Sequence, residues 1–220
     1  MPAVLFDIDG TLTDTNYLHV RAWRLAFKAC GQDVYSARIH RMIGAGAGVV
    51  MRELVGEERQ DVKARWRQEF DRLKGEISAF PAAADLLRAV SRRDLKVVLA
   101  SSSEPDDLDA LLAAIDAPDA IDAVTSAGDV EEAKPSPDVF RTALDRAGCG
   151  PEEALVVGDT VWDLEAAGRC GLGGVAVLSG GISRTELEQA GALAVYDDAA
   201  HLLAELDRSP LARLGPSATG

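Results

Sequence analysis

Near its N-terminus the sequence reads Ala3-Val4-Leu5-Phe6-Asp7-Ile8-Asp9-Gly10-Thr11, a short apolar run followed at once by two acidic residues and a glycine. The apolar run predicts a buried strand, and side chains of an extended chain alternate, so Asp7 and Asp9 share one side. Two anions this close repel each other unless a cation binds, and magnesium commonly uses one or two carboxylates plus substrate phosphate. One carboxylate is then free to act as a nucleophile or a proton carrier. A solvated turn at a strand end explains the same residues without any chemistry.

The composition limits the partners of this chain. Its 220 residues suffice for one sizeable core, or for a core domain that carries a smaller insert. The 36 acidic and 23 basic residues give a formal net charge of −13. This charge argues against nucleic acid and against anionic membranes, because both require a basic surface. An anionic small substrate remains compatible, provided that local cations or a metal ion offset the overall field.

Cysteine usage and hydropathy indicate a cytoplasmic location. Cys30, Cys149 and Cys170 are odd in number and widely spaced, which favours reduced thiols. The chain enters its first expected strand at once, and no apolar run approaches 18 residues. We therefore expect neither a secretory signal nor a membrane-spanning segment.

Strand-like and helix-like segments alternate over most of the chain. Continuous apolar runs, typical of strands that are covered on both faces, lie at residues 3–6, 95–100, 154–157 and 174–178, with weaker ones near 123–125 and 192–195. Helical patterns lie at about 82–93, 106–114, 137–147, 161–169 and 198–206. This alternation predicts an α/β fold with a doubly wound, Rossmann-like parallel sheet as its core. Such sheets bind ligands outside the carboxyl ends of their strands.

The stretch from Thr15 to about Phe80 interrupts this alternation and predicts an inserted α-helical cap domain. Apolar residues recur there at helical spacing, in one set at Ala22, Leu25, Ala26 and Ala29 and in another at Val62, Trp66, Phe70 and Leu73. We expect a discontinuous core at residues 1–14 and 82–208, the cap at 15–81, and a flexible tail at 209–220.

The cap contains Gly44, Gly46 and Gly48 as Gly-x-Gly-x-Gly. No strand precedes these glycines and the full dinucleotide-binding spacing is absent. A turn between cap helices, with its backbone close to a ligand or to the core, is therefore favoured over a dinucleotide site.

Polar residues follow three later strands at the edge where Asp7 is expected. Ser101, Ser102 and Ser103 follow the strand at 95–100, where their hydroxyls can hold a phosphate oxygen or simply cap the next helix. Lys134 precedes Pro135 and Pro137, which stiffen the backbone and start a helix. Its ammonium is either a fixed cation that neutralises a phosphate or an ordinary solvated charge.

The stretch Gly158-Asp159-Thr160-Val161-Trp162-Asp163 follows the strand at 154–157. Asp159 at the strand end and Asp163 in the first helical turn are four residues apart, so both can face one pocket and hold or orient a cation. Acidic residues at a helix N-terminus are also favoured by the helix dipole alone.

These four features, in this order, resemble the haloacid dehalogenase-like superfamily. The resemblance implies that Asp7 attacks phosphorus to form an aspartyl-phosphate, and that Asp9 protonates the leaving group and then activates water. It also implies that Ser101 and Lys134 bind the transferring phosphoryl group. Because the dehalogenase branch lacks an aspartate at position 9, phosphoryl chemistry is favoured over carbon–halogen cleavage.

The resemblance further implies a magnesium cofactor. Asp7, Asp159 and the backbone carbonyl of Asp9 are expected to hold Mg²⁺, with Asp163 in support. Further phosphate or substrate contacts are expected from Gly10, Thr11, Ser102, His19, Gly44 and Gly46.

The position of the cap resembles phosphoglycolate phosphatase-like and β-phosphoglucomutase-like members, which act on small phosphorylated metabolites. Around the first motif, Thr13-Asp14-Thr15, His19 and Arg21-Ala22-Trp23 resemble the mutase branch. This resemblance implies that His19 lies at the cap entrance and helps to couple cap closure to proton transfer. A histidine that only packs or caps the first cap helix fits equally well. The segment 38–44 resembles hydrolytic members, and no sugar-phosphate arginine is found in a recognisable setting.

We therefore predict a magnesium-dependent phosphomonoesterase that acts on a small phosphorylated metabolite. A sugar phosphomutase is the alternative enzyme, and a non-catalytic protein that binds phosphometabolites is the alternative outside enzymes. The sequence does not indicate the substrate or the oligomeric state.

Overall fold

The computed structural model of the chain describes residues 1–101, 103–129 and 134–214. A six-stranded sheet forms its centre, and every neighbouring pair of strands is parallel. The strands are β1 (Ala3–Phe6), β2 (Lys96–Ala100), β3 (Ala123–Thr125), β4 (Ala154–Gly158), β5 (Gly173–Val177) and β6 (Ala192–Tyr196). All six expected strands are present, so the predicted fold class is confirmed.

The strand order is β3-β2-β1-β4-β5-β6. β2 and β3 follow one another on one side of β1, and β4, β5 and β6 follow one another on its other side. The direction of the strand order therefore reverses between β1 and β4. Phe6 pairs with Val157, which brings the carboxyl ends of these two strands together. Ligands of doubly wound sheets bind at such a reversal, and the residues that follow β1 and β4 are Asp7 and Asp159.

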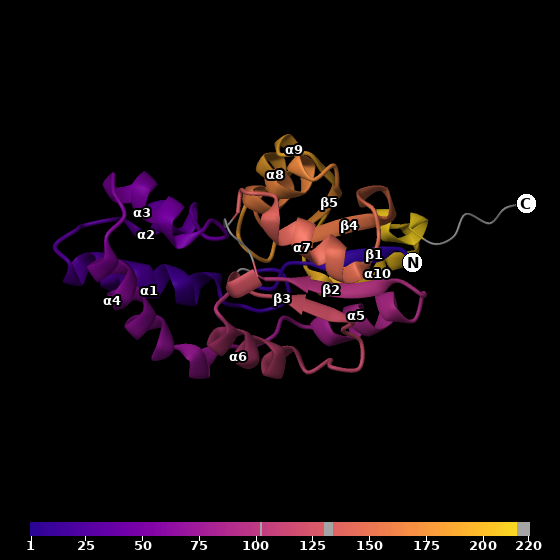
Figure 1. Cartoon of the computed structure of the whole chain (residues 1–220), viewed down its shortest axis with the longest axis horizontal. Helices are drawn as coiled ribbons and strands as arrows, with labels where there is room; N and C mark the ends of the chain where they lie inside the picture. The colour runs from indigo at the N-terminus through magenta and orange to yellow at the C-terminus, as the bar shows by residue number, and fades with distance from the viewer. Residues whose placement is uncertain (102, 130–133, 215–220) are drawn as a thin grey trace, which may run out of the picture.

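Helices cover both faces of the sheet (Figure 1). The core helices are α5 (Ala83–Ser91), α6 (Pro105–Ile115), α7 (Asp138–Ala147), α8 (Val161–Arg169), α9 (Arg184–Gln189) and α10 (Ala199–Ala204). Val4 and Phe6 pack with α5, α6 and α10, whereas Ala3 and Leu5 pack with α7 and α8. Because alternate residues of β1 are buried on opposite faces, the strand reads as a continuous apolar run.

The short helix α9 is absent from the expected elements. It has only six residues, too few for an apolar periodicity. Ser183 and Glu186 form a capping box at its start, and this spacing is the sequence signal that identifies it.

The insert between β1 and α5 consists of helices, as expected: α1 (Asn16–Ala29), α2 (Ser36–His40), α3 (Ala47–Val55) and α4 (Gln60–Asp71). They form one end of the molecule, beyond the carboxyl ends of the strands (Figure 1). The buried face of α1 differs in part from the expected one, since Ala22 and Ala26 are buried as expected. Leu25 is 40% exposed and Ala29 is exposed, whereas Trp23 and Phe27 are buried. Trp23 and Phe27, each one residue after an expected core alanine, are large aromatic side chains, and their burial determines which face of α1 packs inward.

Residues 209–214 differ from the expected flexible tail. Ser209 and Leu211 are each only 1% exposed, and Leu211 packs in the same cluster as helix α10. Leu214 also packs against this cluster, so two leucines hold the segment on the core. No helix among the described residues is long and apolar enough to cross a membrane.

Candidate active site

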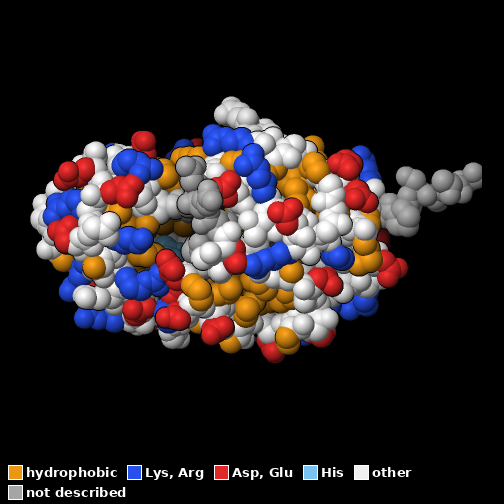
Figure 2. Space-filling view, in the orientation of Figure 1, with side chains coloured by type: hydrophobic (Ala, Val, Ile, Leu, Met, Phe, Trp, Pro, Cys, Tyr) orange, Lys and Arg blue, Asp and Glu red, His pale blue; other side chains and the backbone are white. Residues whose placement is uncertain are grey.

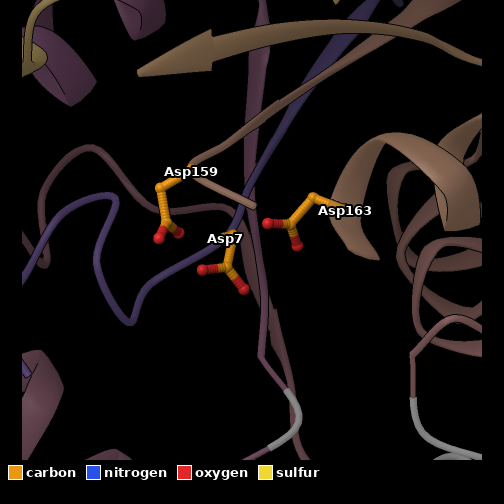
Figure 3. Close-up of side chains that lie close together, drawn as sticks. All are labelled: Asp7, Asp159 and Asp163. Atoms are coloured by element: carbon orange, nitrogen blue, oxygen red, sulfur yellow. The ribbon is translucent and has the colours of Figure 1, made fainter. Parts of the chain in front are cut away.

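Three carboxylates converge where the strand order reverses (Figure 3). Asp7 directly follows β1, Asp159 directly follows β4, and Asp163 lies in the first turn of α8. Each offers an oxygen within 4.8 Å of the oxygens of the other two, and all three residues are buried. Gly158 makes this approach possible, because a Cβ at that position would lie 2.6 Å from Cβ of Asp163. The structure thus places Asp159 and Asp163, which the sequence predicted to face one site, beside Asp7.

Lys134 joins this cluster although it is more than 120 residues from Asp7. Its ammonium donates to Oδ1 of Asp7 and lies 2.7 Å from Oδ1 of Asp163. Lys134 is 1% exposed, so it is not the solvated surface lysine that the sequence left possible. Burial alone would lower its pKa, but Asp163 and Asp7 outweigh burial and raise it. The ammonium is thus a permanent positive charge in the site.

The three carboxylates are not compensated by this one cation. When all are ionised, three negative charges and one positive charge leave a net charge of −2 in a buried site. Burial raises the pKa of Asp7 to about 7, with further increases from Asp163 and Asp9 that Lys134 opposes. Burial also raises the pKa of Asp159, together with repulsion from Asp163 and Asp7. An all-oxygen donor set that carries uncompensated negative charge fits a divalent cation such as Mg²⁺.

Asp9 has a different environment. Its Oδ1 accepts a hydrogen bond from Thr15 Oγ1 at 2.5 Å and lies 3.3 Å from Nε2 of His19. Its Oδ2 accepts from Ser103 Oγ at 3.0 Å. Burial alone would raise the pKa of Asp9, but the contacts with His19, Thr15 and Ser103 outweigh burial and lower it. Asp9 is therefore held as a carboxylate by donors from the cap and from the loop after β2.

His19 is fixed by aromatic packing in the cap. Its ring stacks on Phe70 with 4.2 Å between centroids and an angle of 9° between the planes. Trp66 lies 6.0 Å from the same ring and stacks on Trp23. His19 therefore packs inside the cap and also contacts Asp9, whereas its coupling of cap closure to proton transfer stays a prediction.

The serine loop after β2 differs in part from expectation. Ser101 is 1% exposed, and its Oγ accepts a hydrogen bond from the backbone N–H of Ser103 at 3.0 Å. Ser103, rather than Ser101, contacts Asp9 and lines the cavity described below. Ser102 lies outside the described residues. Because three consecutive hydroxyls look alike in a sequence, only the turn of the backbone decides which one faces Asp9.

Gly10 and Thr11, which follow β1, lie against the carboxylate cluster. Thr11 Oγ1 lies 2.9 Å from Oδ1 of Asp159 and 3.5 Å from Oδ2 of Asp7. Gly10 has φ +81°, and a Cβ there would lie 2.4 Å from Oδ2 of Asp159. Both residues therefore shape the carboxylate cluster, Thr11 by its hydroxyl and Gly10 by leaving room for Asp159.

Sequence reasoning missed Asn16, the first residue of α1. Its Nδ2 donates to Oδ2 of Asp159 at 2.8 Å. A polar residue at a helix start is so common that nothing in the sequence singles this one out. Its partner lies 143 residues away, and only the fold brings them together.

A cavity of about 760 Å³ lies between the cap and the carboxyl ends of the strands. Asp7, Asp9 and Lys134 line its core side, and the glycine loop with Gly44 and Gly46 lines its cap side. Figure 2 shows the hollow between the two parts of the molecule, with charged side chains around it. A small molecule held by the cap therefore meets the carboxylates directly.

The glycine loop packs on the core, as expected for a turn between cap helices. Gly44 has φ +93°, and a Cβ there would lie 2.8 Å from Oγ1 of Thr160. The N–H of Gly46 donates to the backbone carbonyl of Lys134 at 3.2 Å. The backbone of this loop thus meets the segment that carries the buried lysine.

Comparisons with known proteins agree with this geometry. The family model described as haloacid dehalogenase-like hydrolase matches residues 1–171. A solved structure of a hydrolase from Pseudomonas syringae is 37% identical, covers 94% of this chain and 99% of its own, and superposes with a TM-score of 0.88. Protein CbbY from Cereibacter sphaeroides is 31% identical, and the match covers 93% of this chain and 96% of CbbY. Phosphoglycolate phosphatase from Rhodospirillum rubrum is 31% identical, and the match covers 91% of this chain and 88% of that protein.

Proposed function

Because this chain belongs to the haloacid dehalogenase-like hydrolase family, we propose that it is a magnesium-dependent phosphatase of small phosphorylated metabolites. The observation that carries the proposal is Asp7. It is buried at the carboxyl end of β1, bound to Lys134, and lines the cavity under the cap. A phosphate ester in this cavity meets a carboxylate and a fixed cation together.

In the proposed reaction a carboxylate oxygen of Asp7 attacks phosphorus. A bond forms between this oxygen and phosphorus while the bond to the leaving oxygen breaks. Asp9, which is ionised in the free site, takes up a solvent proton when the substrate binds and gives this proton to the leaving oxygen. Asp9 then removes a proton from water, whose oxygen attacks phosphorus, releases inorganic phosphate and restores Asp7. His19, Thr15 and Ser103 orient the Asp9 carboxyl group for both steps.

We propose that Asp7, Asp159 and the backbone carbonyl of Asp9 hold Mg²⁺, with Asp163 in support. The ion would neutralise negative charge on the phosphoryl oxygens. Asp163 would act mainly on the lysine, because its Oδ1 lies 2.7 Å from Nζ of Lys134 and its Oδ2 accepts from Thr160. Lys134 would in turn bind an equatorial oxygen of the phosphoryl group.

The remaining phosphate contacts are proposed at the strand ends. Gly10 and Thr11 follow β1, and the loop after β2 supplies Ser101, which holds the N–H of Ser103, and the predicted Ser102. The cap would contribute His19 and the backbone at Gly44 and Gly46, and exclude water while the leaving group departs. In this proposal the core comprises residues 1–14 and 82–208, and the cap 15–81.

The names of the similar proteins support a small, phosphorylated substrate. One relative is a phosphoglycolate phosphatase, and the cavity of about 760 Å³ has room for a molecule of metabolite size. The formal charge of −13 and the buried negative site disfavour nucleic acid as substrate. We propose action in the cytoplasm, consistent with three free cysteines among the described residues.

The test is phosphate release by Asp7→Asn. We expect activity on a panel of phosphorylated metabolites with Mg²⁺ to fall by more than about 10³-fold, because an amide cannot attack phosphorus. Asp14→Asn is the matched control, since Asp14 is an exposed acid in the same segment. Equal turnover by the wild type and Asp7→Asn would refute the nucleophile, and a wild type inactive on every ester would favour a non-catalytic phosphate-binding protein.

A phosphomutase uses the same first step, and His19 beside Asp9 is the feature that favours it. Phosphorus NMR separates the two functions. A hydrolase converts a sugar 1-phosphate to inorganic phosphate, whereas a mutase converts it to the 6-phosphate. We expect inorganic phosphate.

A further inference from the structure

Asn16 connects the cap to a proposed metal ligand. It is the first residue of cap helix α1 and is 3% exposed. Its Nδ2 donates to Oδ2 of Asp159 at 2.8 Å and to the backbone carbonyl of Gly180 at 3.3 Å. Gly180 lies between β5 and α9, so one amide group joins three separate parts of the chain.

The surroundings of Asp159 allow its carboxylate little freedom. A Cβ at Gly180 would lie 1.7 Å from Oδ2 of Asp159, and one at Gly10 would lie 2.4 Å from it. Thr11 holds the other oxygen, Oδ1, at 2.9 Å. Two glycines thus pack directly on Oδ2, and Asn16 supplies its hydrogen-bond donor.

A second cap helix reaches the same place. Nε2 of His40, the last residue of α2, lies 2.8 Å from the carbonyl oxygen of Gly180, a distance at which the ring N–H donates. The His40 ring stacks on Tyr17, the neighbour of Asn16, with 5.1 Å between centroids. The carbonyl that receives the Asn16 amide is therefore itself fixed by the cap.

We infer that Asn16 is a positioning residue for the metal site, which holds the Asp159 carboxylate in the orientation that binds a divalent cation. This inference rests on the proposed function only in taking Asp159 as a ligand. Without the Asn16 amide, Thr11 alone among the described residues donates to the Asp159 carboxylate, and repulsion from the nearby Asp7 and Asp163 carboxylates favours its rotation away from them. In the part of the chain that the structure describes, Lys134 is the only cation that pairs with those two neighbours. The amide of Asn16 opposes this rotation before the ion arrives.

The inference predicts a loss of metal affinity rather than a loss of chemistry. Groups that orient metal ligands typically change metal affinity by about 10- to 100-fold when removed. For Asn16→Ala and the nearly isosteric Asn16→Leu we expect about tenfold weaker Mg²⁺ binding. Their turnover falls at limiting Mg²⁺ and recovers toward the wild-type value at saturating Mg²⁺.

The experiment is calorimetric titration of the full chain with MgCl₂ alone, without substrate. Two control variants lie on the same helix. Val20→Ala removes a buried cap side chain, and Lys28→Ala removes an exposed one. We expect Val20→Ala to lower the melting temperature without changing Mg²⁺ affinity, and Lys28→Ala to change neither.

Wild-type affinity in both folded Asn16 variants would overturn the inference, and so would an equal loss of affinity in Val20→Ala. If the alanine variant does not fold, the leucine variant decides alone. Failure of the wild type to bind Mg²⁺ overturns the proposed cofactor as well. A different result overturns the positioning role only: the wild type binds Mg²⁺, and the Asn16 variants bind it with the same affinity.

Discussion

Asp7 and Asp9 are separated by one residue, yet they lie in opposite electrostatic environments. Asp7 is placed among other carboxylates, and burial raises its pKa to about 7 despite Lys134. Asp9 faces hydrogen-bond donors, which lower its pKa. The difference teaches that one side of the site is organised to attract a cation, whereas the other is organised to stabilise a single carboxylate that the cap contacts.

The largest effect that tests this comparison is expected from Asp9→Asn. We expect kcat to fall by about 10²- to 10⁴-fold, because the proton carrier is lost. The affinity for Mg²⁺ is expected to stay at the wild-type value, because the backbone carbonyl at position 9 remains. Steady-state kinetics and calorimetric titration with MgCl₂ measure the two quantities. If Asp9→Asn lowered the affinity for Mg²⁺ as well as kcat, the side chains of Asp7 and Asp9 would both belong to the cation-binding part of the site.

A smaller effect is expected from pH on Mg²⁺ binding to the wild type. Since the pKa of Asp7 is raised from 3.8 to about 7, a metal ion must displace a proton from it below pH 7. Affinity should rise by up to about tenfold per pH unit between pH 5 and 7, and level off as Asp7 loses its proton. Calorimetric titration at several pH values checks this, and a flat profile would contradict the raised pKa.

The raised pKa of Asp7 also determines whether the metal-free protein gains or loses stability as the pH rises. A carboxyl group with a raised pKa binds more protons in the folded state than in the unfolded state. The metal-free protein should therefore lose stability as the pH rises from 3.8 toward 7, and Mg²⁺ should restore it above that range. Thermal unfolding with and without MgCl₂ measures both.

The smallest effect is expected from Ser103→Ala. It removes one of three hydrogen-bonding contacts to Asp9, worth about 1 kcal/mol, so kcat should fall only a few-fold. The pKa of Asp9 should rise, which moves the basic limb of the kcat/KM profile, where the proton donor is lost, to higher pH. Ser91→Ala, at the end of α5, is the control. An unchanged profile would mean that Ser103 does not hold Asp9 in solution.

Much of the site follows from its position on the sheet. Asp7 and Asp159 each follow an expected strand, and parallel strands have their carboxyl ends at the same edge of the sheet. The sequence therefore predicted that the two residues lie close together at this edge. Lys134 and Asp163 were also predicted there, and the structure brings all four together. The role of Asn16 and the contact of Ser103 with Asp9 were not predicted, because a helix start and a run of serines carry no information about a distant partner.

The sequence by itself determined the parallel α/β fold, the helical insert and the family. The signals were its apolar runs and four short motifs, each of which lies within a few consecutive residues. Only the tertiary structure decided the unequal environments of Asp7 and Asp9, the partner of Asn16 and the burial of Leu211. The physical reason is that burial and hydrogen bonding depend on distances between segments far apart in the chain. Local pattern fixes which groups are available, and packing fixes which of them meet.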